Sequence, residues 1–198
     1  MQNSGYTNKI DFLSSLAIMF LLSSFFYSSA CPSIYAASKE VNMSTATLTL
    51  ASPAFTEGQT IPKQYTADGA NVSPPLSWGK ASGDTQSFAL ICEDPDAPAG
   101  TWIHWIVYDI PANKTSLSEG VSTKPTLPDG SKQGVTSFHR VGYGGPSPPP
   151  GKPHRYYFKL YALNTVSGLE PGIDLAQFRN LIAHHKIAQT EIMGTYGR

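Results

Sequence analysis

Short apolar runs separated by turn residues make up the chain from Thr47 to its C-terminus. Leu48 and Leu50 alternate with threonines, the pattern of a strand with one buried face. Residues 87–92 (SFALIC) form a continuous apolar run, which is typical of a strand buried on both faces. This succession of short strand signals predicts an all-β sandwich.

Further strand-like runs follow the same pattern. They are residues 61–65, 104–110 (HWIVYDI), 156–163 (YYFKLYAL) and, as a last edge strand, 188–196. Turn dipeptides such as Asp68-Gly69 separate them, and the polar, turn-rich residues 111–135 are expected to wrap the outside.

One helix is predicted, near the C-terminus. Asp174 is a good N-cap, and apolar residues recur after it at helical spacing, at Leu175, Phe178, Leu181 and Ile182. A helix of about three turns is expected to cover an open end of the sandwich. His184 and His185 fall in its last turn, where we attribute them to the helix dipole rather than to a ligand. The predicted fold class is therefore all-β with a minor helix: an antiparallel Greek-key-type β-sandwich with a C-terminal helix.

Residues 1–43 differ in character from the rest and predict a signal peptide or N-terminal export segment with a linker. Lys9 precedes a seven-residue apolar core, residues 16–22 (LAIMFLL), and small residues follow at 28–30. The core is too short to predict a transmembrane span, although an uncleaved anchor that associates with the membrane stays open. We expect an exported protein of the cell envelope or periplasm, with residues 44–198 as its single domain.

Two alternatives for this N-terminal region stay open. Cys31 after small residues suggests a lipid anchor, but Ser28 stands where a lipobox usually has Leu. Translation from Met43 would instead lead straight into the first strand pattern and give a cytoplasmic product.

Composition limits the range of functions. With 14 basic and 14 acidic residues among 198, the chain has no net charge, and no basic patch interleaved with aromatics predicts nucleic-acid binding. Its two cysteines, Cys31 and Cys92, lack the spacing of a metal site and lie too far apart in the sequence to favour a disulfide framework.

Residues 142–156 (GYGGPSPPPGKPHRY) carry the first candidate chemistry. Four Gly and five Pro exclude a helix and leave a stiff loop that can line a pocket. A Pro-rich linker is the simplest alternative. His154 stands where this loop enters an apolar strand, so an ionisable cluster is fixed at a strand end, which argues against a linker.

A second cluster lies in Asp94-Pro-Asp-Ala-Pro and the following Trp102-Ile-His104. Two carboxylates flanking a proline usually bond to the backbone of a turn. Here, however, the turn joins two predicted strands, so Asp94, Asp96 and His104 are confined to one end of them. If the loop before His154 lies at that end, two His and two Asp converge.

These three motifs, DPDAP, W-x-H before a strand and a Gly-Pro loop ending in HRY, resemble the phosphatidylethanolamine-binding protein family, also called Raf kinase inhibitor proteins. The order and spacing resemble its bacterial branch, over residues 47–196. The resemblance implies an antiparallel β-sandwich with a C-terminal helix and a small anion pocket at one end of the sheets. It also implies non-catalytic binding of phosphate-bearing small ligands or phospholipid head groups, with no metal and no cofactor.

Matched motif by motif, the resemblance assigns eight pocket residues: Asp94, Pro98, Trp102, His104, Gly145, Pro146, His154 and Tyr156. Asp96 and Arg155 belong to the same motifs and are expected to support the pocket from outside. The chain departs from the bacterial pattern at Ser147, often Cys in relatives, and at residues 136–138.

The residue chemistry fits an anion site independently. A protonated His is a charge-assisted donor to phosphate, Tyr156 adds a hydroxyl, and free N–H groups of the Gly loop are further donors. Asp94 would favour His protonation and accept from a ligand ammonium group, which suits a zwitterionic head group.

Two other functions stay open. His104, His154 and one Asp would suit a metal-dependent hydrolase or oxygenase. Alternatively, the protein would be an interaction module that inhibits a kinase or a protease, with the same pocket in a regulatory role. The sequence does not separate this function from simple ligand binding. A Ser-His-Asp hydrolase is disfavoured, because no serine lies in a nucleophile-elbow motif.

Overall fold

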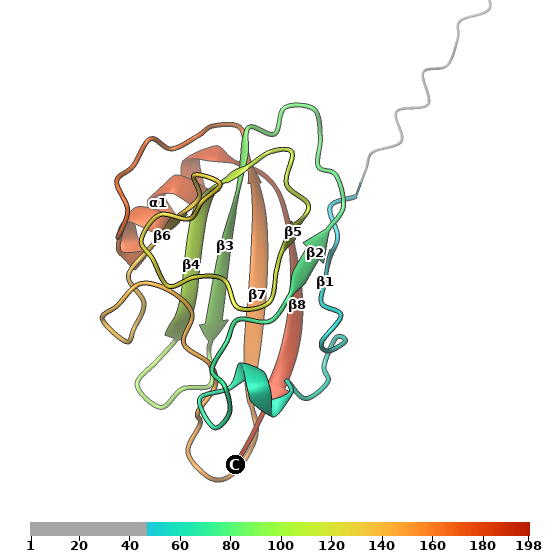
Figure 1. Cartoon of the computed structure of the whole chain (residues 1–198), viewed down its shortest axis with the longest axis vertical. Helices are drawn as coiled ribbons and strands as arrows, with labels where there is room; N and C mark the ends of the chain where they lie inside the picture. The colour runs from blue at the N-terminus through green and yellow to red at the C-terminus, as the bar shows by residue number, and fades with distance from the viewer. Residues whose placement is uncertain (1–46) are drawn as a thin grey trace, which may run out of the picture. The chain divides into compact units, whose positions relative to one another are not determined.

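Two antiparallel β-sheets pack face to face in this computed structural model, which describes residues 47–198 (Figure 1). The smaller sheet has the order β1 (Leu50–Ala51), β2 (Leu76–Trp78), β5 (Ser116–Leu117). The larger sheet has the order β6 (Lys132–Gln133), β4 (Trp102–Pro111), β3 (Ser87–Asp94), β7 (His154–Leu163), β8 (Lys186–Tyr196). Because β7 returns beside β3, the order β7-β3-β4-β6 is of the Greek-key type.

The continuous apolar run of β3 is buried on both sides, as the sequence predicts. Phe88, Leu90 and Cys92 pack in the core between the two sheets, whereas Ala89 and Ile91 pack on the opposite face. Successive side chains of a strand point to opposite faces, so a strand covered on both sides needs apolar residues at every position.

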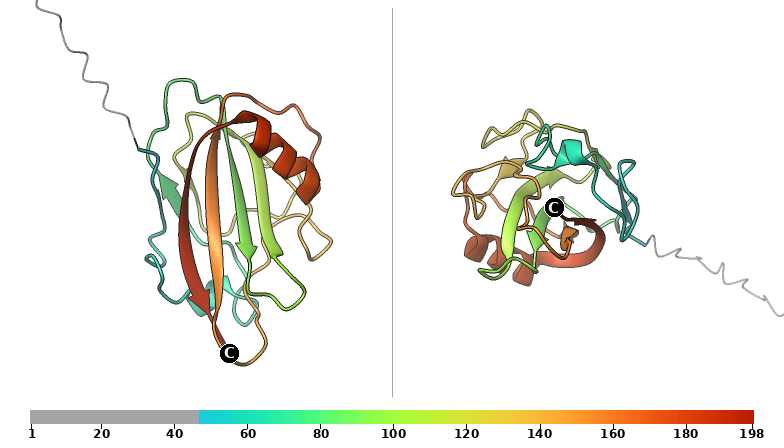
Figure 2. Two further views of the ribbon diagram at one scale, coloured as in Figure 1. Left: turned by 180° about the vertical axis from the view of Figure 1, so that it is seen from behind. Right: turned by 90° about the horizontal axis from the view of Figure 1, so that it is seen from below.

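The predicted helix is α1 (Leu175–His185), and it begins with a capping box. The side chain of Asp174 accepts from the backbone N–H of Gln177, and the Gln177 side chain accepts from the backbone N–H of Asp174. Phe178 and Leu181 are buried in a cluster with Ala89 and Ile91 of β3, and α1 lies over the outer face of the five-stranded sheet (Figure 2, left). The expectation that the helix closes an open end of the sandwich is therefore wrong. It covers the sheet face that the smaller sheet leaves free, because that face is itself apolar.

Two other expectations need correction. Residues 61–65 do not form a strand but lead into a 3₁₀ helix, η1 (Lys63–Tyr65), directly after Pro62, whose ring fixes φ near the helical value. The last strand, β8, begins two residues earlier than expected and pairs with β7 along its whole length at the sheet edge.

The three long strands β3, β4 and β7 extend beyond their apolar runs into the DPDAP, W-x-H and HRY motifs. β3 ends at Asp94, β4 begins at Trp102 and β7 begins at His154. Because β3 is antiparallel to both neighbours, these three strand ends lie side by side at one end of the sheet, the lower end in Figure 1. The topology thus brings the three motifs together.

The predicted export segment, the lipid anchor at Cys31 and the domain boundary at residue 44 lie outside the described residues and stay predictions. Within residues 47–198, no helix has the length and apolar character needed to cross a membrane.

Candidate functional site

A cavity of about 270 Å³ opens where β3, β4 and β7 meet. Six of the eight predicted pocket residues line it: Asp94, Pro98, Trp102, His104, His154 and Tyr156. The remaining lining residues are Ala97, Ala99, Phe138, Ser147, Pro148 and Pro149. The strand ends supply the ionisable groups, and the loops supply small or apolar walls.

A β-bulge in β4 positions His104. Cys92 is paired with Trp105 and Glu93 with Ile103, so His104 has no partner of its own on β3. Ile103 packs on the helix-covered face, whereas Trp105 packs between the sheets and the ring of His104 lies 5.2 Å from that of Tyr156. The extra residue of a bulge re-aims a side chain, and here it turns His104 into the cavity.

The ring of His104 is held firmly. Its Nδ1–H donates to the backbone carbonyl of Gly144 at 2.6 Å, and the ring makes edge contacts with Phe138 and Tyr156. The residue is only 3% exposed, and this burial lowers the pKa of His104 below its usual value, although the Gly144 carbonyl and the Asp94 carboxylate oppose the shift. Near neutral pH the ring is therefore neutral, with its hydrogen on Nδ1.

The second imidazole is held by a buried carboxylate. Nδ1–H of His154 donates to Oδ2 of Asp94 at 2.8 Å, while Oδ1 of Asp94 accepts from the backbone N–H of Asp96 at 2.8 Å. Asp94 is 3% exposed and the His154 side chain 13%. Both histidines are thus anchored through Nδ1, and neither Nε2 makes a hydrogen bond to residues 47–198.

Tyr156 lines the cavity and packs edge-on against the ring of His104. It is buried in the inter-sheet core, and burial, followed by the charge of Asp94, raises the pKa of its phenol. The hydroxyl therefore keeps its proton through the physiological pH range.

Asp96 and Arg155 brace the site from outside, as expected. The guanidinium of Arg155 binds Asp96 through two bonds of 2.7 and 2.9 Å, and the backbone N–H of Arg155 also donates to Asp96 at 2.9 Å. These bonds hold the pKa of Asp96 at about 2. They join the DPDAP turn to the first residues of β7, and neither side chain lines the cavity.

Gly145 and Pro146 lie behind the cavity and do not line it. A Cβ on Gly145 would come within 2.5 Å of the carbonyl oxygen of Tyr65, so only glycine fits there. The carbonyl of Pro146 accepts from the backbone N–H of Ala67. These two residues therefore fasten the loop to the segment that contains η1, and the cavity wall begins with Ser147.

The expectation that the Gly loop supplies free N–H donors is wrong for its two central glycines. The N–H of Gly144 donates to the carbonyl of His104 at 2.9 Å, and the N–H of Gly145 donates to Oδ1 of Asn71 at 2.7 Å. A buried backbone donor needs a partner, and the fold supplies one for each of them.

Sequence reasoning did not assign several walls of the cavity. Phe138 and Ser147 were noted as departures from a family pattern, but nothing in their local sequence indicates that they face a pocket. Ala97, Ala99 and two prolines were also unassigned, because small and apolar residues carry no chemical signal. Their position depends on how the loops pack.

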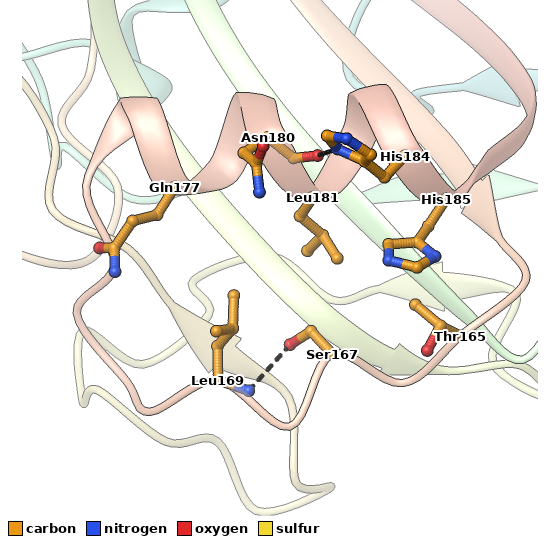
Figure 3. Close-up of a pocket in the computed structure, with 8 residues that line it drawn as sticks. All are labelled: Thr165, Ser167, Leu169, Gln177, Asn180, Leu181, His184 and His185. Carbon is orange, nitrogen blue, oxygen red and sulfur yellow. Dashed lines mark hydrogen bonds between the residues drawn. The ribbon is translucent and has the colours of Figure 1, made fainter.

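A larger cavity, of about 470 Å³, lies between α1 and residues 165–169 (Figure 3). It contains His184 and His185, and the apolar side chains of Leu169 and Leu181 point into it. Among the described residues that line it, none is Asp, Glu, Lys or Arg, and His184 donates from Nδ1 to the Asn180 carbonyl in the last helical turn. Size alone favours this groove, but we place the candidate site in the smaller cavity, which holds buried, mutually oriented ionisable groups.

The site does not have the geometry of a metal centre. In residues 47–198 no group of three or more His, Cys, Asp or Glu side chains is arranged to hold a metal ion. The metal-dependent alternative thus gains no support from the arrangement of His104, His154 and Asp94.

Comparison with protein families gives one match over most of the chain. The model described as "Phosphatidylethanolamine-binding protein" matches residues 51–197. A "UPF0098 protein" of Methanothermobacter thermautotrophicus is 45% identical over 151 residues, which are 76% of this chain and 99% of the relative. Another, of Aquifex aeolicus, is 46% identical over 149 residues, 74% of this chain and 86% of the relative.

Two solved structures share the fold. One is described as a putative phosphatidylethanolamine-binding protein homologue from Chlamydia trachomatis, with a TM-score of 0.71 and 39% identity. The other is E. coli YbcL, described as a new member of the mammalian phosphatidylethanolamine-binding protein (PEBP) family, with a TM-score of 0.72 and 34% identity. Each match covers 77% of this chain and 99% of the other.

Proposed function

Because this chain belongs to the phosphatidylethanolamine-binding protein family, we propose that its cavity binds phosphate-bearing small ligands or phospholipid head groups and does not convert them. One observation carries the proposal. His104 and His154 are both anchored through Nδ1 and line the same small cavity, which leaves each Nε2 for a ligand oxygen. An imidazolium bound to phosphate is a charge-assisted contact.

The rest of the cavity supports a zwitterionic head group. The hydroxyl of Tyr156 keeps its proton and is hydrogen-bonded to the buried carboxylate of Asp94, which would also accept from a ligand ammonium. A volume of about 270 Å³ is enough for a head group and too small for acyl chains, which would remain outside.

The experiment is a titration of the full chain with phosphoethanolamine at pH 6, followed by calorimetry and by amide NMR shifts. His104→Ala and His154→Ala should each lose about 1.5–3 kcal/mol of binding free energy, the scale of a hydrogen bond to a charged group. His184→Ala is the matched control, because that histidine lies on α1 outside the cavity. NMR spectra of the free variants establish that each is folded.

Unchanged affinity in both site variants would place the ligand elsewhere. The same conclusion would follow if His184→Ala lost as much affinity as they do. His154→Ala is the safer of the two site variants, because His154 is more exposed than His104.

One observation favours a second function, hydrolysis. The bond from His154 Nδ1 to the Asp94 carboxylate is the orienting half of a nucleophile-activating triad, and Ser147 lines the same cavity. No hydrogen bond joins Ser147 to His154 in the described part of the chain, so we prefer binding without turnover. Phosphorus NMR of phosphoethanolamine incubated with the protein decides, since release of inorganic phosphate would establish the enzyme.

We also propose export to the cell envelope or periplasm, from the apolar core at 16–22 and the small residues at 28–30. Mass spectrometry of the native protein should find a mature N-terminus near Cys31 or Ala36. A species that begins only at Met1 or Met43 would contradict this proposal.

A further inference from the structure

The cavity has no permanent cation. Among the described residues that line it, none is Lys or Arg, and Asp94 is the only carboxylate. The arginines nearby are engaged outside the wall: Arg155 with Asp96, Arg198 with the carbonyls of Ser147 and Pro148, and Arg140 against the ring of Phe138. With both imidazoles neutral, the cavity therefore carries a formal charge of −1, an unfavourable environment for an anion.

When they are neutral, both imidazoles present a hydrogen-bond acceptor to the cavity, not a donor. Because Nδ1 of His104 donates to a carbonyl, which can only accept, Nε2 of the neutral ring is an acceptor. The same reasoning applies to His154, whose Nδ1 donates to Asp94. The side-chain donors among the described residues that line the cavity are the hydroxyls of Tyr156 and Ser147 and the indole N–H of Trp102, and the hydroxyl of Tyr156 is already hydrogen-bonded to Asp94.

The groups around His104 determine what a proton on Nε2 would meet. Asp94 approaches from β3, and His154 and Tyr156 approach from β7. The charge of Asp94 favours a proton on His104, whereas burial and a charged His154 oppose it. Asp94 is already bonded to His154, so His104 is the ring without a directly bonded carboxylate.

We propose that the cavity selects anions that bring their own proton: it binds phosphate monoesters as the singly protonated anion, whose P–O–H donates to Nε2 of His104. The inference rests on the proposed function and narrows its ligand class. The proton stays between the phosphate oxygen and Nε2, or moves onto Nε2 and leaves the dianion beside an imidazolium. The total charge of the complex is the same in both cases, and no covalent bond changes.

Phosphodiesters and sulfate lack this proton. The second pKa of a phosphate monoester is about 6, so near that pH about half of the monoester still carries a proton. A diester or a sulfate would present a bare oxygen to Nε2. His104 would then have to take a proton from water, although burial disfavours its charged form.

Two matched pairs of probes test the inference on the full chain at pH 6: phosphoethanolamine against glycerophosphoethanolamine, and inorganic phosphate against sulfate. The monoester and phosphate should bind at least about fivefold more tightly than their partners, the minimum for one unsatisfied buried acceptor. Between pH 6 and pH 8, phosphoethanolamine should weaken by about fifty-fold, because its protonated fraction falls from about a half to about a hundredth.

His104→Gln supplies a second measurement. Its side-chain amide can present an N–H donor where Nε2 accepts, so the preference for phosphate over sulfate should shrink or reverse. The corresponding change on α1, His185→Gln, should leave the preference intact.

The outcomes separate this inference from the proposed function. Equal binding within both pairs of probes overturns the inference and leaves the phosphate pocket standing. Binding by none of the four probes overturns both. If the diester binds more tightly than the monoester, the ligand is a lipid head group whose proton comes from water, and the inference fails.

Discussion

Two cavities of this protein each hold a pair of histidines, one where the ends of β3, β4 and β7 meet and the other beside α1, yet they are built differently. Between β3, β4 and β7, His104 is buried and His154 is bonded to a buried carboxylate. Beside α1, His184 is exposed and His185 half-buried, and both donate to neutral oxygens, those of Asn180 and Asn164. The second cavity is larger, but its lining, within residues 47–198, includes no Asp, Glu, Lys or Arg.

The comparison shows that neither the volume of a cavity nor its histidines identify a binding site. Burial strengthens an electrostatic contact and makes an unsatisfied group costly, so we expect binding in the smaller cavity to depend on the charge and the protons of the ligand. The pair on α1 is more open to water, which screens it, and His184 satisfies a helix-terminal carbonyl, that of Asn180.

The largest difference between the two regions should appear in packing. Leu160 is fully buried between the sheets, so Leu160→Ala should cost about 2–5 kcal/mol of unfolding free energy. Leu181 borders the open groove, and the space vacated by Leu181→Ala can fill with water, so its cost should lie at or below the lower end of that range. Urea unfolding measures both. Equal losses would show that the groove wall is as closely packed as the core.

A smaller effect is expected from the helix cap. Asp174→Ala removes the side chain that accepts from Gln177 N–H and should cost about 0.5–2 kcal/mol. Because α1 lies outside the cavity proposed for the ligand, phosphoethanolamine affinity should not change. A loss of affinity in this folded variant would mean that the two regions are coupled. Asp174→Asn, which keeps an acceptor oxygen, is the control.

The pH dependence of stability should distinguish the histidine pairs. The pKa of His104 is lowered in the folded state, so the unfolded chain binds more protons as pH falls below about 6.5. Unfolding free energy should therefore fall from pH 7.5 toward pH 5 in phosphate-free buffer. This slope should be reduced in His104→Gln and kept in His185→Gln. An unchanged slope in His104→Gln would assign the effect to another group.

The smallest effect is expected at the surface brace. The pKa of Asp96 is lowered to about 2 by Arg155, so the pair stabilises the fold above the unfolded value of about 3.9 and loses this contribution as pH falls toward 2. Asp96→Asn should therefore be slightly less stable than wild type at pH 6 and nearly equal to it at pH 2. Solvent screening keeps the difference small. A difference that grows toward pH 2 would contradict this account.

Much of the fold and part of the site follow from the sequence. Apolar runs predict the three long central strands, and the helix signals around Asp174 predict α1, because each pattern reflects a local periodicity. Six of the eight predicted pocket residues line one cavity, because their motifs flank strands whose antiparallel pairing brings the ends together. The 3₁₀ turn at Lys63–Tyr65 and the face covered by α1 were not predicted correctly.

The sequence by itself determined which residues carry ionisable chemistry and which strand ends they occupy, since composition and periodicity are properties of neighbouring positions. Only the tertiary structure decided where these side chains point and which of their polar atoms are free to bind a ligand. The bulge that turns His104 into the cavity depends on its register with β3, and the N–H of Gly145 is taken by Asn71, 74 residues away. Hydrogen-bond satisfaction and burial depend on contacts between distant segments, and these contacts determine which nitrogen of each imidazole is left for a ligand.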